Sequence, residues 1–193
     1  MSDATAMTAL RAAVLATARA MNAERLNRGA AGNVSARHDD GLLITPTGMA
    51  YDACTPEDMC FVGLDGRCEG RRKPSSEWRF HHDIYVARPE AGAIVHAHAP
   101  FAVSLACMGM AIPAFHYMVA RFGGSDVRCA DYATFGSQEL SDAVVRALDG
   151  RRACLMAHHG MVVFGGNLDE ALALAVELEA LCEQYWRVLQ IGG

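Results

Sequence analysis

Lysine is nearly absent from this sequence of 193 residues, since Lys73 is the only one and it follows two arginines in a predicted turn. A chain with so little lysine offers few candidates for catalysis through a Schiff base, which needs a lysine amine in the active site. Basic residues are also fewer than acidic ones, with 17 Lys and Arg against 22 Asp and Glu and a net charge of -5. This balance argues against nucleic-acid binding, which needs positive charge concentrated on one face.

Long hydrophobic runs, a secretory signal and paired cysteine motifs are also missing. No stretch reaches the roughly 18 unbroken apolar residues that a membrane span requires. The start of the chain, Met1 to Ala4, lacks the basic and apolar regions of a signal peptide. The 7 cysteines show no C-x-x-C spacing and, being odd in number, cannot all pair within one chain. These features predict a cytoplasmic protein with reduced cysteines and no membrane partner.

The sequence does contain a mixture of helix and strand patterns, without a repeat or a linker. Apolar residues at helical spacing predict helices over 4–24, 76–88, 101–108 and 137–148, and a last helix from Asn167 past Trp186. Short apolar runs predict strands over 42–45, 60–64, 93–99 and 153–157. Ser75 or Ser76 is expected to cap the second helix, which would place Glu77 in its first turn. The length suits a single α/β domain over residues 1–193.

Histidines stand out in the apolar segments. His96 and His98 are separated by one residue, so their side chains project from the same face of a strand. His158 and His159 follow another predicted strand further along the chain. Three imidazoles that meet near a carboxylate such as Glu77 would form a nearly tetrahedral metal site with a base beside it. A histidine in an apolar segment can also be a hydrogen-bonded core residue, so the residues alone leave both interpretations open.

Short motifs along the chain carry a further signal. In order, they are Gly32-Asn33-Val34-Ser35, Ile44-Thr45-Pro46-Thr47-Gly48, Pro74-Ser75-Ser76-Glu77-Trp78-Arg79-Phe80-His81, Val95-His96-Ala97-His98, His116-Tyr117-Met118, Tyr132-Ala133-Thr134-Phe135-Gly136 and His158-His159-Gly160. Together they resemble the class II aldolase/adducin family, and the likeness is greatest to its aldolases of L-fuculose 1-phosphate. The resemblance extends over nearly the whole chain, from the first helix to the last.

The resemblance implies a three-layer α/β/α domain around a mainly antiparallel central sheet. It also implies a homotetramer with active sites between neighbouring subunits. The implied cofactor is one Zn²⁺ per subunit, which Co²⁺ or Mn²⁺ could replace. Matching motif to motif, the metal ligands would be His96, His98, His159 and, in the absence of substrate, Glu77.

The same resemblance implies the contacts to substrate. Glu77 would be the acid/base, and Tyr117 would reach into a neighbouring subunit's site and donate a proton to the aldehyde oxygen. His158 is expected to be a structural neighbour. Amides of glycine turns, hydroxyls and a helix N-terminus can hold a phosphate without lysine. The residues expected to line the phosphate pocket are Gly32, Asn33, Thr47, Gly48, Ser75 and Ser76.

The expected reaction is the reversible cleavage of a ketose 1-phosphate to dihydroxyacetone phosphate and an aldehyde, through a metal-stabilised enediolate. The substrate would be L-fuculose 1-phosphate or a related deoxy- or methylthio-ketose 1-phosphate. A sugar-phosphate 4-epimerase, decarboxylase or dehydratase of the same fold is the alternative. A non-catalytic adducin-like scaffold is a weaker alternative, because the expected ligands are all present. No H-E-x-x-H pattern supports a metallopeptidase.

The sequence departs from the fuculose-phosphate pattern in three places. Ala30 stands in the glycine turn where a threonine is common, and Arg121-Phe122 follow Tyr117 where small residues are expected. The chain ends at Gly193, short of the longer tail that is expected to close the site. These differences leave the expected metal ligands intact and leave the identity of the aldehyde open.

Overall fold

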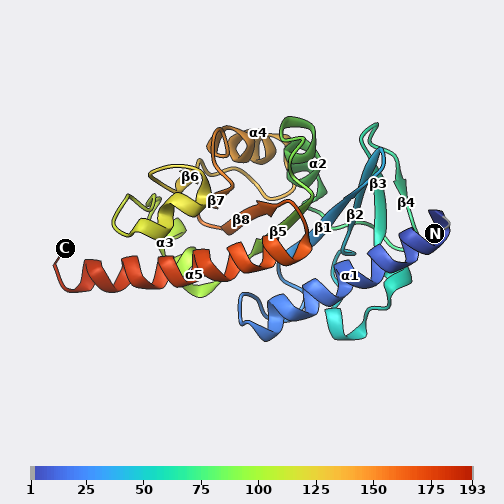
Figure 1. Cartoon of the computed structure of the whole chain (residues 1–193), viewed down its shortest axis with the longest axis horizontal. Helices are drawn as coiled ribbons and strands as arrows, with labels where there is room; N and C mark the ends of the chain where they lie inside the picture. The colour runs from blue at the N-terminus through green and yellow to red at the C-terminus, as the bar shows by residue number, and fades with distance from the viewer. Residues whose placement is uncertain (1–2, 193) are drawn as a thin grey trace.

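An eight-stranded sheet forms the centre of this computed structural model, which describes residues 3–192 (Figure 1). Its strands are β1 Asn33–His38, β2 Gly41–Ile44, β3 Cys60–Gly63, β4 Cys68–Glu69, β5 Ala93–Ala97, β6 Arg128–Ala130, β7 Ala153–Met156 and β8 Gly160–Gly165. Their order in space is β4-β3-β2-β1-β5-β8-β7-β6. Only β6 and β7 pair in parallel among these strands. The sheet is therefore mixed, with mostly antiparallel pairs.

Helices cover both faces of the sheet and make the three layers expected from the resemblance (Figure 1). The α-helices are α1 Asp3–Ala23, α2 Trp78–Ala87, α3 Pro100–Cys107, α4 Gln138–Ala147 and α5 Leu168–Gln190. Three short 3-10 helices are η1 Tyr51–Ala53, η2 Pro56–Asp58 and η3 Tyr117–Phe122. Helices α1, α3 and α5 pack on one face, and α2 and α4 on the other. No helix within residues 3–192 is long and apolar enough to cross a membrane.

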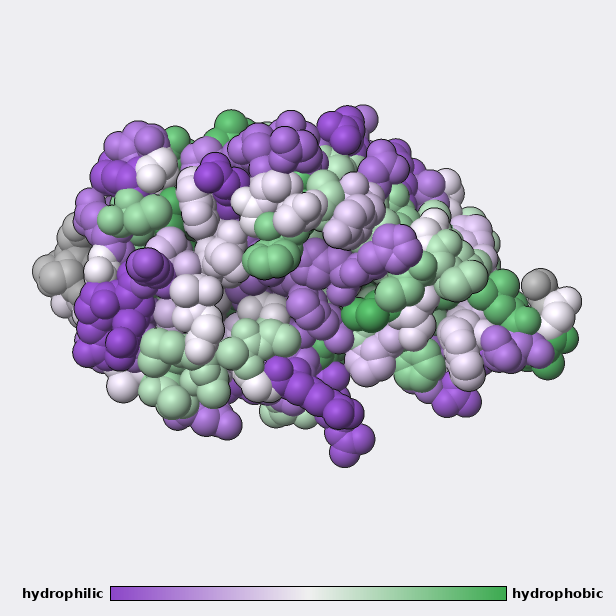
Figure 2. Space-filling view, turned by 180° about the vertical axis from the view of Figure 1, so that it is seen from behind, coloured by the Kyte–Doolittle hydropathy of each residue, from purple (hydrophilic) through white to green (hydrophobic). Residues whose placement is uncertain are grey.

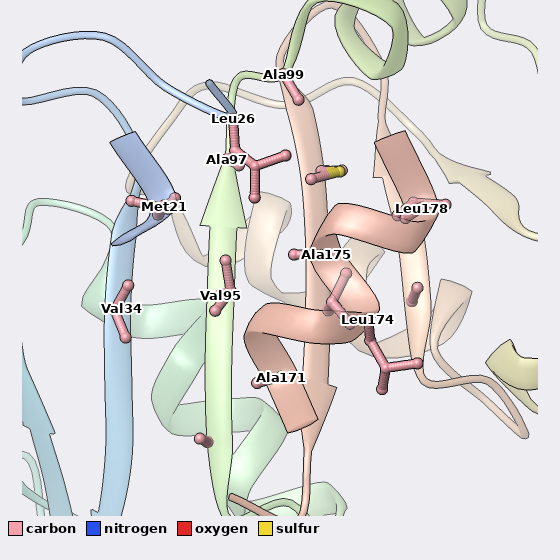
Figure 3. Packing of buried hydrophobic residues seen from close by; sticks show 14 of the residues in the cluster. Met21, Leu26, Val34, Val95, Ala97, Ala99, Ala171, Leu174, Ala175 and Leu178 are labelled. Atoms are coloured by element: carbon pink, nitrogen blue, oxygen red, sulfur yellow. The ribbon is translucent and has the colours of Figure 1, made fainter. Parts of the chain in front are cut away.

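Alternation along β5 divides the core and sets the direction of the histidines. Val95 and Ala97 face the layer of α1 and α5 and belong to the same buried cluster as Met21 and Ala175 (Figure 3). Ile94 faces the layer of α2 and α4. Because side chains alternate along a strand, His96 shares the side of Ile94. The histidine therefore points toward α2 and the residues that precede it.

The surface seen from behind carries hydrophilic side chains, with hydrophobic residues in smaller patches between them (Figure 2).

Helix α1 has a buried side and an exposed side. Its predicted inward residues Val14, Leu15, Ala18 and Met21 are buried, whereas Leu10 is partly buried. The predicted amphipathic helix over 4–24 is thereby confirmed in position and in its buried side.

The start of α2 differs from the expectation. The helix begins at Trp78 with Glu77 as its N-cap, so neither Ser75 nor Ser76 caps it and Glu77 precedes its first turn. The Ser75 hydroxyl instead accepts hydrogen bonds from the backbone N–H of Glu77 and from Asn33 Nδ2. The carboxylate of Glu77 contacts Asn33 and histidines. The backbone of Glu77, with φ of -103 and ψ of 14, lies outside the helical range. The tertiary contacts of this carboxylate displace the helix start by two residues.

Candidate metal centre and adjoining cavity

Three histidines and Glu77 converge at one end of the central strands β5 and β8. His96 lies inside β5 and His98 follows its last residue, so the predicted strand over 93–99 ends before His98. His159 belongs to the turn between β7 and β8, and Glu77 precedes α2. One potential ligand atom of each residue lies within 4.8 Å of those of the others. The structure thus brings together all four side chains that the resemblance implied as metal ligands.

The ring nitrogens and the carboxylate face a common point. His96 Nε2 is 3.0 Å from His98 Nε2 and 3.2 Å from Glu77 Oε2, and His159 Nε2 is 3.0 Å from Glu77 Oε1. The three rings pack edge to face, with centroids 4.8 to 4.9 Å apart. Glu77 Oε1 is buried yet receives no hydrogen bond. Facing ring nitrogens and an unsatisfied carboxylate oxygen fit a divalent cation, whose positive charge would satisfy them together.

The electrostatic environment favours the metal-binding protonation states. Burial alone would raise the pKa of Glu77, but the adjacent imidazoles of His96 and His159 outweigh it and hold that pKa well below its usual range. Burial lowers the pKa of His98 to about 4, and the neighbouring rings of His96 and His159 act in the same direction. Glu77 is therefore ionised and His98 neutral near pH 7, which are the forms that bind a cation.

Asn33, at the start of β1, holds the carboxylate from the side of the sheet. Its Nδ2 donates to Glu77 Oε2 at 2.9 Å and to Ser75 Oγ at 3.0 Å. Its Oδ1 accepts from His81 Nε2. Burial and the charge of His96 lower the pKa of His81 to about 3, although Glu77 acts in the opposite direction. The side-chain amide of Asn33 is thus fully engaged by protein groups.

Two residues that the sequence analysis did not assign hold the glycine loop over 27–32 against the histidines. Asn27 Oδ1 accepts from the backbone N–H of His98 at 2.7 Å, and the Tyr51 hydroxyl donates to Gly32 O at 2.7 Å. Gly32 has a φ of +68, and an added Cβ would lie 2.1 Å from Asn27 Nδ2. The left-handed backbone and the close approach both require glycine at this position.

A cavity of about 390 Å³ adjoins the cluster of Glu77 and the histidines. Its lining includes every residue expected in the phosphate pocket, Gly32, Asn33, Thr47, Gly48, Ser75 and Ser76. The two chain segments that carry Thr47 and Ser75 in this lining run side by side, because Thr47 N donates to Lys73 O and Ser75 N donates to Thr45 O. His96 is fully buried behind the cavity rather than part of its lining.

An aromatic wall closes another side of this cavity. It consists of Tyr132, Ala133, Phe135 and His158. The rings of Tyr132 and His158 meet edge to face at 5.7 Å, and His158 has a left-handed φ of 57. Neither Tyr132 nor Phe135 was predicted as a site residue, although the motif that contains them joins two aromatics to a glycine turn.

Tyr117 is separate from the cavity of its own chain. It lies in η3, is 81% exposed, and lines a shallow depression with His116 and Val119 instead. Among the predicted site residues described by the structure, it is the one that the fold of a single chain does not bring to the others.

Known proteins resemble this chain in sequence and in structure. Residues 12–186 match the family described as Class II Aldolase and Adducin N-terminal domain. The 5-methylthioribulose-1-phosphate/5-deoxyribulose-1-phosphate aldolase of Rhodospirillum rubrum is 56% identical over 184 residues, which cover 95% of this chain and 83% of that protein. The L-fuculose phosphate aldolase of Escherichia coli is 48% identical over 166 residues, covering 86% and 77% respectively. A solved L-fuculose 1-phosphate aldolase has a TM-score of 0.92 at 34% identity, covering 95% of this chain and 88% of that one.

Proposed function

The chain belongs to the class II aldolase and adducin family, and we propose that it is a zinc-dependent aldolase of a ketose 1-phosphate. The enzyme cleaves this substrate reversibly into dihydroxyacetone phosphate and an aldehyde. The convergence of Glu77 with His96, His98 and His159, beside a cavity lined by amides and hydroxyls, supports the proposal more than any other feature.

Glu77 is the acid/base of the proposed reaction. His96, His98 and His159 hold the cation, and a nitrogen-rich set of this kind suits zinc. The bound cation supplies an electron sink for the negative charge that develops as the carbon-carbon bond breaks. In the condensing direction Glu77 removes a proton from C3 of dihydroxyacetone phosphate, and in cleavage it returns the proton to that carbon. The contact with Asn33 keeps the carboxylate in place for both directions.

The phosphate of the substrate occupies the part of the cavity between two paired segments. Thr47 and Gly48 lie on one segment, and Ser75 and Ser76 on the other, joined through the bridge between Pro46 and Pro74. Gly48 has a φ of +69 and no atom within 4 Å of an added Cβ, so its backbone is open to a ligand. Hydroxyls and backbone N–H groups in such turns bind a dianion without a lysine.

The aldehyde half of the substrate lies against Tyr132, Phe135 and His158. An aromatic wall stabilises an apolar group such as a methyl or methylthio substituent better than a chain of hydroxyls. The relative from Rhodospirillum rubrum is named for 5-methylthioribulose 1-phosphate and 5-deoxyribulose 1-phosphate. We therefore place these two compounds first among the substrates and L-fuculose 1-phosphate after them.

A neighbouring copy of the chain supplies Tyr117 to the site. The tyrosine is 81% exposed and lies outside the cavity of its own chain, as a residue that acts across an interface would. It donates a proton to the aldehyde oxygen when the carbon-carbon bond forms, and it takes the proton from the corresponding hydroxyl when that bond breaks. This role requires an oligomer, and we propose the homotetramer that the sequence resemblance implies.

A cleavage assay with a panel of ketose 1-phosphates tests this function. The panel contains the methylthio, deoxy and L-fuculose compounds, and dihydroxyacetone phosphate is measured with and without a chelator. Release that the chelator abolishes and added Zn²⁺ restores is the expected result. A protein that binds zinc but releases no dihydroxyacetone phosphate from any compound would overturn the proposal and favour an epimerase, decarboxylase or dehydratase.

A further inference from the structure

A row of buried polar side chains leads from Glu77 into the interior beneath the cavity. Asn33, His81, Ser35 and Tyr85 form this row, with exposed fractions of 2%, 0%, 0% and 1%. His81 Nε2 hydrogen-bonds to Asn33 Oδ1, and His81 Nδ1 is 2.7 Å from Ser35 Oγ. Ser35 Oγ is in turn 2.9 Å from the Tyr85 hydroxyl. Only the Asn33 end of the row touches the proposed acid/base.

The spacing of the row in the sequence follows from the two elements that carry it. Asn33 and Ser35 alternate on β1 and therefore share one face of the sheet. Glu77, His81 and Tyr85 recur at intervals of four residues and so lie along one side of α2 and its N-cap. The strand and the helix thus place their polar residues opposite one another, in a layer whose buried side chains are mostly apolar.

The directions of the hydrogen bonds follow from the charge of Glu77. The carboxylate accepts only, so the Asn33 amide must turn its Nδ2 toward Glu77 and its Oδ1 toward His81. His81 therefore carries its proton on Nε2, and its Nδ1 accepts from the Ser35 hydroxyl. The Tyr85 hydroxyl then donates to Ser35 Oγ. Each donor in the row points toward the carboxylate.

We propose that His81 is a positioning residue, which fixes Asn33 and through it the orientation of the Glu77 carboxylate. This inference rests on the proposed function, because it takes Glu77 as the acid/base. Ser35 and Tyr85 hold His81 in the tautomer that donates from Nε2. A hydrogen-bonded row of this kind is costly to bury unless all its members are satisfied. Partners behind a ligand or catalytic side chain typically change activity or metal affinity by about 10–100-fold when removed.

The tautomer of His81 can be measured without substrate or metal. In isotope-labelled protein, nuclear magnetic resonance distinguishes protonated from unprotonated ring nitrogens, and the His81→Gln variant assigns the signals of His81. We expect a protonated Nε2 and an unprotonated Nδ1 in metal-free protein near neutral pH. A proton on Nδ1, or on both nitrogens, would overturn the proposed direction of the row and with it the positioning role.

Variants of His81 test the consequence for catalysis. His81→Leu keeps a similar apolar volume but removes both polar contacts, and we expect a kcat reduced by about 10–100-fold with little change in KM. His81→Gln offers an amide donor to Asn33 and a carbonyl acceptor to Ser35, and should recover most of the lost kcat. Ser35→Ala and Tyr85→Phe apply the same test to the other members of the row. We expect the loss of kcat to be smaller for the residue that lies farther from Glu77.

Ser141→Ala provides the matched control. Ser141 is also 0% exposed and its hydroxyl donates a hydrogen bond to Asp83, on the same helix as His81 but outside the row. Its substitution should leave kcat unchanged. If His81→Leu does not fold, Ser35→Ala and Tyr85→Phe decide, because each removes only one hydroxyl.

The outcomes separate this inference from the proposed function. A wild-type protein that cleaves no substrate would overturn the function itself. An active wild type whose His81→Leu variant keeps full kcat, or whose His81→Gln variant is as slow as His81→Leu, would overturn only the positioning role. A loss of kcat in Ser35→Ala that Ser141→Ala reproduces would also count against it, since burial alone would then explain the effect.

Discussion

His96 Nδ1 donates a hydrogen bond to the backbone carbonyl of Met161 at 2.9 Å. Since a neutral imidazole carries one proton, this bond leaves Nε2 unprotonated and directed at His98 and Glu77. The bond exists because β5 and β8 pair with His96 opposite Val162. The sheet itself therefore selects the ring tautomer that can bind a cation.

Glu77→Gln should separate catalysis from metal binding. Glutamine has nearly the same volume and can still accept from Asn33 through its carbonyl oxygen, but it cannot take a proton from C3. Since acid/base groups typically contribute about 10²–10⁴ in rate, we expect a loss of turnover of that order with metal retained by the three histidines. Cleavage rates and metal content of the purified variant are the measurements. Undiminished turnover would remove Glu77 from the role of base.

Metal removal should lower the thermal stability of the protein. A ligand that binds only the folded state at 100 times its Kd stabilises it by about 2.7 kcal/mol, so chelation should lower Tm and added Zn²⁺ should restore it. His96→Ala should abolish both the response of Tm to zinc and the cleavage activity. His82→Ala is the control, because His82 pairs with Asp83 away from the cluster. A Tm of His96→Ala that still rises with zinc would place the metal elsewhere.

Tyr117→Phe should impair one half of the reaction only. Without the hydroxyl, proton transfer to and from the aldehyde oxygen slows, whereas the exchange of the C3 proton of dihydroxyacetone phosphate depends on Glu77 and should continue. The two rates can be compared by substrate cleavage and by isotope exchange. Equal losses in both assays would contradict the assignment of Tyr117 as the donor to the aldehyde.

Gly32→Ala and Gly29→Ala form a matched pair. Both glycines are left-handed, with φ of +68 and +66, but only at Gly32 would a Cβ meet other atoms, among them His96 O at 2.5 Å. Each variant should lose about 1–2 kcal/mol for the backbone conformation, and Gly32→Ala a further 1–3 kcal/mol, roughly, for the overpacking. Urea unfolding measures the difference. Equal stabilities for the two variants would show that the loop adjusts without cost.

Asp58 should contribute an acid-sensitive part of the stability. Its hydrogen bonds with Arg71, the backbone N–H of Thr55 and Arg72 hold its pKa well below the usual range. Because the folded-state pKa is lower than the unfolded one of about 3.9, the stabilisation is complete above that value and is lost as the pH falls below it. Asp58→Asn should therefore be less stable at neutral pH and lose less stability on acidification. Parallel pH profiles of urea unfolding for the two proteins would contradict this.

Sequence patterns could predict the elements that carry a clear period, but not those without one. The helices over 4–24 and 137–148 bury the residues that their spacing indicated, including Leu140 and Val144, except for the partly buried Leu10. Strand β1 was not predicted, because Asn33, Ser35 and Arg37 make it read as polar although its first four residues are buried. β4 and β6 are too short for any period to appear.

In the candidate site, too, some contacts could be predicted from the sequence and others could not. The spacing of His96 and His98 predicts that they act together, and the resemblance adds His159 and Glu77, which the structure brings into one cluster. The contact between His81 and Asn33 could not be predicted, because it depends on how α2 packs over β1. The position of Glu77 at the N-cap likewise depends on contacts with distant residues rather than on local helix signals.

The register of β5 also has a consequence for how this chain folds. Its odd-numbered residues belong to one core layer and His96 faces the other, so a slip by one residue would turn the histidine into the layer of α1 and α5. His159 reaches the cluster only once β8 has paired with β5, between segments far apart along the chain. During refolding, the ability to bind a metal ion should therefore appear late, together with this long-range pairing. The time course of metal binding should then report when the native strand alignment forms.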